Sequence, residues 1–69
     1  MTILNPDQTL TSREKDVARL ASRGLSNKSI ARELRVREGT IKVHLHNIYQ
    51  KLGISNRIEL ILKEVDRNK

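Results

Sequence analysis

The chain has 69 residues, a formal net charge of +6 and a hydrophobic content of 36%, which leaves room for one small domain. It contains no Cys, Trp or Phe, and this excludes disulfides, thiolate metal sites and cysteine nucleophiles and requires an aliphatic core. No apolar run reaches the length of a membrane span, and the N-terminus lacks the pattern of a signal peptide, so we expect a small intracellular protein.

The first predicted helix follows a polar segment. Residues 1–9 show no periodicity and are expected to form an N-terminal arm or linker. Thr11 followed by Glu14 is a capping-box pattern, which predicts the start of a helix. Gly24 can adopt the left-handed conformation that ends a helix. The residues expected to face the core are Val17, Ala18, Leu20 and Ala21.

Two more helices are predicted in the middle of the chain. Ser26 is suited to be the N-cap of a short helix that continues to about Leu34, with Ile30 and Ala31 also inward. Residues 35–37 interrupt the apolar period and form a turn. The next helix covers about residues 38–52 and ends at Gly53. Its apolar face follows helical spacing through Ile41, Leu45, Ile48 and Leu52.

A fourth helix is predicted after Ser55, which we expect to be its N-cap. Its apolar stripe consists of Ile58, Ile61, Leu62 and Val65. No segment alternates at period two, so no strand is expected. The predicted fold is therefore all-α, with a four-helix domain over residues 10–66 and a C-terminal tail over residues 67–69.

Positive charge is concentrated in the middle of the chain. From Arg13 to Lys51 there are ten basic and four acidic residues, a balance of +6. This composition alone is compatible with a polyanionic partner or with an ordinary solvated surface. Two short helices joined by a tight turn in a basic context favour the first alternative, as a helix-turn-helix that binds DNA.

The third helix presents a polar face opposite its apolar one. That face holds side chains that can contact base edges in the major groove: Lys42, Val43, His46, Asn47 and Gln50. The flanks of this helix, and the start of the helix before it, carry groups expected to contact DNA phosphates: Ser26, Asn27, Lys28, Arg37, Thr40, His44 and Lys51.

Several motifs together resemble the LuxR-type helix-turn-helix domain, which occurs in NarL/FixJ response regulators, quorum-sensing regulators and stand-alone regulators such as GerE. The motifs are Leu10-Thr11-Ser12-Arg13-Glu14, Gly24-Leu25-Ser26-Asn27-Lys28, Ile30-Ala31, Thr40-Ile41-Lys42-Val43-His44, Ile48, Lys51-Leu52-Gly53-Ile54 and Arg57. The resemblance covers roughly residues 10–66.

The resemblance implies a bacterial transcription factor, located at the nucleoid in the cytoplasm, that binds double-stranded DNA as a homodimer. It implies that Lys42, Val43 and His46 face bases, whereas Lys28, Thr40, His44 and Lys51 lie near phosphates. The fourth helix, with Ile58, Ile61, Leu62 and Val65, would make the dimer contact. Glu14 and Arg57 would hold the first helix to the start of the fourth. RNA polymerase is a further candidate partner.

The sequence departs from the family pattern at four positions. Ser29 stands where Glu is frequent, which weakens a second capping box. Arg37 replaces the usual Ser or Thr and cannot cap the third helix in the same way. Gly39 removes a side chain from the first turn of that helix. Tyr49 replaces an aliphatic residue, and we expect its ring to pack at the margin of the core.

Other functions remain as alternatives. A promoter-binding domain like region four of sigma factors has a similar helix pair, and a protein-interaction module could dock a partner on the apolar stripe of the fourth helix. A membrane-surface helix is disfavoured because no Trp or Phe is present to insert. We expect no enzyme activity, no cofactor and no small-molecule ligand. We also expect no metal site, because His44 and His46 point to different faces of a helix.

Overall fold

The computed structural model describes the backbone of residues 10–67 and the side chains of residues 10–63. Its helices are α2 (Ser12–Ser22), α3 (Asn27–Leu34), α4 (Glu38–Leu52) and α5 (Arg57–Arg67). No strand occurs within residues 10–67, so the predicted all-α class is confirmed. Among the described residues, no helix qualifies as a membrane span. The predicted arm of residues 1–9 lies outside the described part of the chain.

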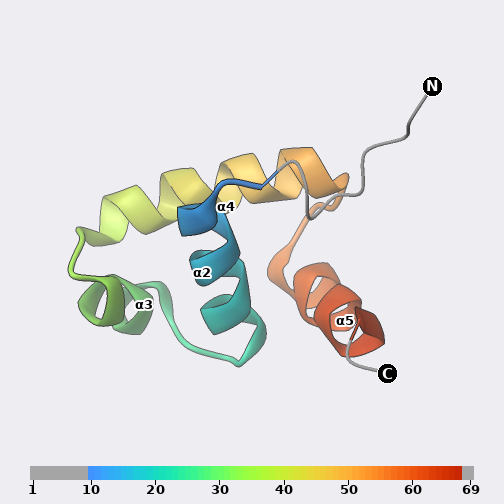
Figure 1. Cartoon of the computed structure of the whole chain (residues 1–69), viewed down its shortest axis with the longest axis horizontal. Helices are drawn as coiled ribbons and strands as arrows, with labels where there is room; N and C mark the ends of the chain where they lie inside the picture. The colour runs from blue at the N-terminus through green and yellow to red at the C-terminus, as the bar shows by residue number, and fades with distance from the viewer. Residues whose placement is uncertain (1–9, 68–69) are drawn as a thin grey trace.

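Helix α2 lies at the centre of the arrangement and contacts the other three helices (Figure 1). The long helix α4 runs across one side of α2, and α2 lies between α3 and α5. Helix α3 also packs against α4. The two helices of the predicted helix-turn-helix are therefore held by direct contact with each other and by a shared contact with α2.

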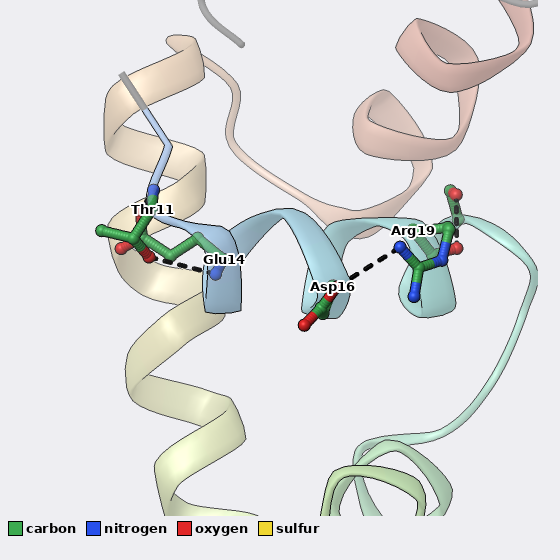
Figure 2. A network of polar contacts seen from close by, with 5 residues as sticks. Thr11, Glu14, Asp16 and Arg19 are labelled. Atoms are coloured by element: carbon green, nitrogen blue, oxygen red, sulfur yellow. Dashed lines mark hydrogen bonds and ion pairs between the residues drawn. The ribbon is translucent and has the colours of Figure 1, made fainter. Parts of the chain in front are cut away.

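The first two helix starts follow the capping pattern predicted from the sequence. The Thr11 hydroxyl accepts a hydrogen bond from the Glu14 amide at 3.1 Å, and the Glu14 carboxylate accepts one from the Thr11 amide at 3.0 Å (Figure 2). At α3, the Ser26 hydroxyl accepts from the Ser29 amide at 3.1 Å. Both caps satisfy amides that the first helical turn leaves without a partner.

The predicted cap of the last helix is wrong by one residue. The Asn56 side chain, not that of Ser55, accepts a hydrogen bond from the Glu59 amide, at 3.0 Å. Ser55 instead donates its backbone amide to the Glu59 carboxylate at 2.6 Å. Asn is as good an N-cap as Ser, and Glu59 lies three residues after Asn56, where a capping carboxylate belongs.

The ends of α2, α3 and α4 share one geometry. Each of these helices is followed by a residue with positive φ and then by an apolar residue. The backbone amide of the apolar residue donates a hydrogen bond to the carbonyl five residues earlier. These backbone bonds are Leu25 to Leu20 at 3.3 Å, Val36 to Ala31 at 2.9 Å and Ile54 to Tyr49 at 2.9 Å. This is the Schellman pattern, which also packs the apolar residue against the core. Gly24 and Gly53 therefore end their helices as predicted.

The core is entirely aliphatic apart from the margin, where the Tyr49 ring packs as expected. Its buried apolar residues are Leu10, Val17, Ala18, Leu20, Ala21, Ile30, Ala31, Ile41, Leu45, Ile48 and Leu60. All the inward positions predicted in the first three helices are buried except Leu34 and Leu52, which are half-buried against the same cluster.

Helix α5 packs on the core with a different face from the predicted stripe. Leu60, which was not assigned to the core, is 2% exposed, whereas Ile58 is 67% and Leu62 59% exposed. Ile61 is half-buried, and the side chain of Val65 lies outside the described residues. The sequence of α5 has apolar residues on two neighbouring faces, and only the packing against α2 decides which face is inward.

Candidate nucleic-acid interface

The outward face of α4 carries no acidic residue after the first turn of the helix. Lys42, Val43, His46 and Gln50 are exposed, and Val43 is 60% exposed despite being aliphatic. Asn47, the remaining predicted base-contacting residue, is half-buried. The only acidic residue of α4 is Glu38, in its first turn. Hydrogen-bond donors and an apolar contact are groups that can read base edges in the major groove.

The predicted phosphate-contacting residues differ in the exposure and in the hydrogen bonds of their side chains. Lys28, Arg37 and Thr40 are exposed, and His44 is half-buried. Arg37 occupies the N-cap of α4 and makes no side-chain capping bond, as expected for a residue with no acceptor. Ser26 is exposed, but its hydroxyl already caps α3 and also donates to the Ser29 hydroxyl at 3.1 Å.

Lys51 forms an ion pair with the carboxylate of Glu14. Its Nζ lies 2.7 Å from Oε1 of Glu14, and the two side chains are 34% and 5% exposed. Burial of the Glu14 carboxyl raises its pKa, but the hydrogen bonds from Lys51 and Thr11 and the Lys51 charge outweigh this effect, so the pKa lies below its ordinary value. The contact joins the start of α2 to the last turn of α4.

The expectation that Glu14 and Arg57 hold the first helix to the start of the fourth is therefore wrong. Arg57, the first residue of α5, donates from Nη1 to Oδ1 of Asn27 at 2.7 Å and from Nη2 to the backbone carbonyl of Leu25. Glu14 faces the end of α4, while Arg57 faces the start of α3. No local sequence pattern indicates these contacts, because their partners lie between 30 and 37 residues apart in the chain.

The turn between α3 and α4 contains an unexpected backbone conformation. Arg35 has φ 60° and ψ 44°, the left-handed region that usually favours glycine. Arg32, Arg35 and Arg37 are all exposed around this turn. The sequence gives no Gly or Pro signal here, so the turn could be located only from the interruption of the apolar period.

Residues 8–63 match the family described as bacterial regulatory proteins, luxR family. The chain is 53% identical over 53 residues to the HTH-type transcriptional regulator MalT of Vibrio campbellii, covering 77% of this chain and 6% of that protein. It is 40% identical over 65 residues to the nitrate/nitrite response regulator protein homolog of Haemophilus influenzae, covering 94% and 31%.

A solved structure of the response regulator StyR has the same helix arrangement. The TM-score is 0.78 at 48% sequence identity, and the match covers 81% of this chain and 28% of that one. The present chain thus spans less than a third of each of these three relatives. It belongs to the luxR family of bacterial regulatory proteins and carries the helix-turn-helix DNA-binding domain of that family.

Proposed function

We propose that this domain binds double-stranded DNA in a sequence-specific manner to regulate bacterial transcription, with α4 in the major groove. The observation that carries the proposal is the outward face of α4, where Lys42, Val43 and His46 are exposed and no carboxylate follows Glu38. A solvated helix face would more often alternate acidic and basic residues at a spacing of four. The site of action would be nucleoid DNA in the cytoplasm.

Each residue of this face can bind a group on a base edge in the groove. Lys42 can donate to the O6 and N7 acceptors of guanine, and Asn47 and Gln50 can pair with adenine. The methyl groups of Val43 can meet the methyl group of thymine. His46 donates a ring N–H toward an acceptor on a base edge. Together these side chains would read a short stretch of base pairs on one side of the duplex.

Phosphate contacts would fix the register of α4. The exposed ammonium of Lys28 lies in the first turn of α3, where the helix dipole also attracts an anion. Arg37 and Thr40 at the start of α4, with His44 on its flank, would contact the backbone beside the groove, and Ser26 and Asn27 would do so at the start of α3. Lys51 can join them only if its ammonium shares or leaves the Glu14 carboxylate.

The domain is proposed to form a dimer on DNA through α5. Ile58 and Leu62 are among the few large apolar side chains exposed on the described surface, and they lie four residues apart on one helix face. Ile61 and Val65 would extend this contact. The stripe is small, so we expect the dimer to form mainly when two half-sites place two domains side by side.

Sequence specificity is tested by selecting binding sites from a pool of random duplexes with the wild-type domain, Val43→Ala, His46→Ala and Lys63→Gln. The wild type is expected to enrich one motif, and the two α4 variants to change the preferred bases at single positions. Lys63, an exposed lysine on α5, is the control and should leave the motif unchanged. Binding without enrichment, or an identical motif in all variants, would contradict the proposal.

The exposed α5 residues also favour a second candidate, a surface that docks another protein. RNA polymerase remains a candidate partner for such a surface. Replacing Lys42 and His46 separates the two functions, because these changes should abolish DNA binding and leave docking through α5 intact.

A further inference from the structure

The guanidinium of Arg57 joins the starts of two helices. Its Nη1 donates to Oδ1 of Asn27 at 2.7 Å, and its Nη2 donates to the Leu25 carbonyl. Arg57 is the first residue of α5, Asn27 is the first residue of α3, and Leu25 lies in the connection between α2 and α3. Both side chains are half-buried. One fork of donors therefore fixes the segment that leads into α3.

This contact also determines which atoms Asn27 presents outward. A guanidinium has only donors, so the amide atom that faces Arg57 must be the oxygen. The Nδ2 group then lies on the opposite side of the Cβ–Cγ bond and points away from Arg57. Among the described residues Nδ2 makes no hydrogen bond, yet no fully buried side-chain nitrogen or oxygen lacks a partner. The Nδ2 nitrogen is therefore at least partly exposed to solvent, in the residue that precedes the exposed Lys28.

We propose that Arg57 is a positioning residue for DNA binding: it holds the Asn27 amide so that Nδ2 donates to a phosphate oxygen. The inference rests on the proposed DNA-binding function. An amide held in one orientation before binding loses little rotational freedom when the phosphate arrives. The charge-assisted bond to Oδ1 also polarises the amide and makes its N–H a stronger donor. Arg57 itself contacts no phosphate in this arrangement.

A double-mutant cycle tests whether Arg57 acts through Asn27. The variants are Asn27→Ala, Arg57→Lys and the double variant, measured by fluorescence anisotropy on a labelled duplex of random sequence at low salt. Lysine keeps the charge but cannot form the fork. Asn27→Ala is expected to weaken binding about tenfold, as for the loss of a hydrogen bond to a charged group. Arg57→Lys is expected to weaken it several-fold, and the double variant no further than Asn27→Ala.

The cycle has clear outcomes. If the two losses of affinity multiply, Arg57 does not act through Asn27 and the inference is overturned. The salt dependence is a second criterion, because Arg57→Lys should leave the slope of log affinity against log salt unchanged. A wild-type domain that fails to bind the duplex would instead contradict the proposed function as a whole.

Asn27→Asp tests the same contact without disturbing the fold. Its carboxylate can still accept from Arg57, so the melting temperature should be retained, but it has lost the Nδ2 donor. Ser29→Asp is the matched control, since it adds the same charge at an exposed position in the same helical turn. Asn27→Asp is expected to weaken binding about tenfold more than Ser29→Asp. Equal losses would show that only charge matters, and would overturn the inference even if Arg57→Lys does not fold.

Discussion

Glu14 is the only polar or charged residue among those buried in the described part of the chain. It completes the capping box of α2 through the Thr11 amide and at the same time bonds to Lys51 of α4. Removing one partner of a buried charged pair is costly because the other charge loses its compensation. Here Lys51 is 34% exposed and can turn toward water, which limits that cost.

Replacing Glu14 by Gln removes the negative charge of the side chain but keeps its ability to cap α2. Gln can still accept from the Thr11 amide, so the expected loss in the free energy of unfolding, about 1–2 kcal/mol, reflects the ion pair with Lys51. Urea denaturation measures it. Asp16→Asn is the control, because the Asp16–Arg19 pair is exposed and 3.4 Å long (Figure 2) and should contribute less than about 0.5 kcal/mol. Equal losses in both variants would contradict this account of Glu14.

The lowered pKa of Glu14 predicts a dependence of stability on pH. A carboxyl whose pKa is lower in the folded state stabilises the fold above its unfolded pKa, about 4.3. This contribution is lost as the pH falls from that value through the folded pKa. Melting curves between neutral and acid pH should therefore show a smaller loss of stability for Glu14→Gln than for the wild type. Parallel curves for the two proteins would contradict the prediction.

At the scale of the helices, each connection depends on one residue in the left-handed conformation. Glycine occupies this position after α2 and α4, with φ of 91° at Gly24 and 68° at Gly53. After α3 the same position is held by Arg35, for which the conformation costs about 1 kcal/mol relative to glycine. The turn of the helix-turn-helix therefore contains backbone strain that the two other connections avoid.

Arg35→Gly is expected to raise the free energy of unfolding by up to about 1 kcal/mol, because glycine adopts the left-handed conformation without strain. Thermal denaturation measures the change. Arg23→Gly is the matched control, since Arg23 is also exposed after a helix but has φ −86°. There glycine should lower stability by about 0.5–1 kcal/mol through the greater freedom of the unfolded chain. A loss at both positions would show that the turn is not strained.

Features that depend on a few neighbouring residues were predictable from the sequence. The Thr11–Glu14 capping box, the Ser26 cap and the stops at Gly24 and Gly53 all follow from local patterns, and the structure confirms them. The Asn56 cap was missed because two adjacent residues, Ser55 and Asn56, are both good caps.

Features that depend on packing could not be derived from local patterns. Leu60 is buried because α5 lies against α2, and the contacts of Glu14 and Arg57 join residues far apart in the chain. The same limit applies to the interface. The outward face of α4 followed from its apolar period, whereas the engagement of Lys51 by Glu14 depended on the relative placement of two helices.

At the scale of the whole molecule, α5 presents an apolar surface away from the core. Leu62→Glu should leave the fold intact, because Leu62 is 59% exposed. If α5 forms the dimer contact, this variant should lose cooperative binding to a duplex with two half-sites and keep its affinity for a single half-site. Lys63→Glu is the control for charge and should retain cooperativity. Unchanged cooperativity in Leu62→Glu would exclude this face as the dimer contact.

Fluorescence anisotropy with a labelled duplex at several salt concentrations tests whether the surface of α3 and α4, on which Lys28, Arg37 and Lys42 are exposed, binds DNA. We predict that the logarithm of the binding constant falls linearly with the logarithm of the salt concentration. Lys28→Gln should reduce the magnitude of this slope by about 0.9, the value for one lost phosphate contact. Lys63→Gln should leave the slope unchanged. Absence of binding at low salt, or equal slopes in the wild type and Lys28→Gln, would rule out DNA binding through this surface.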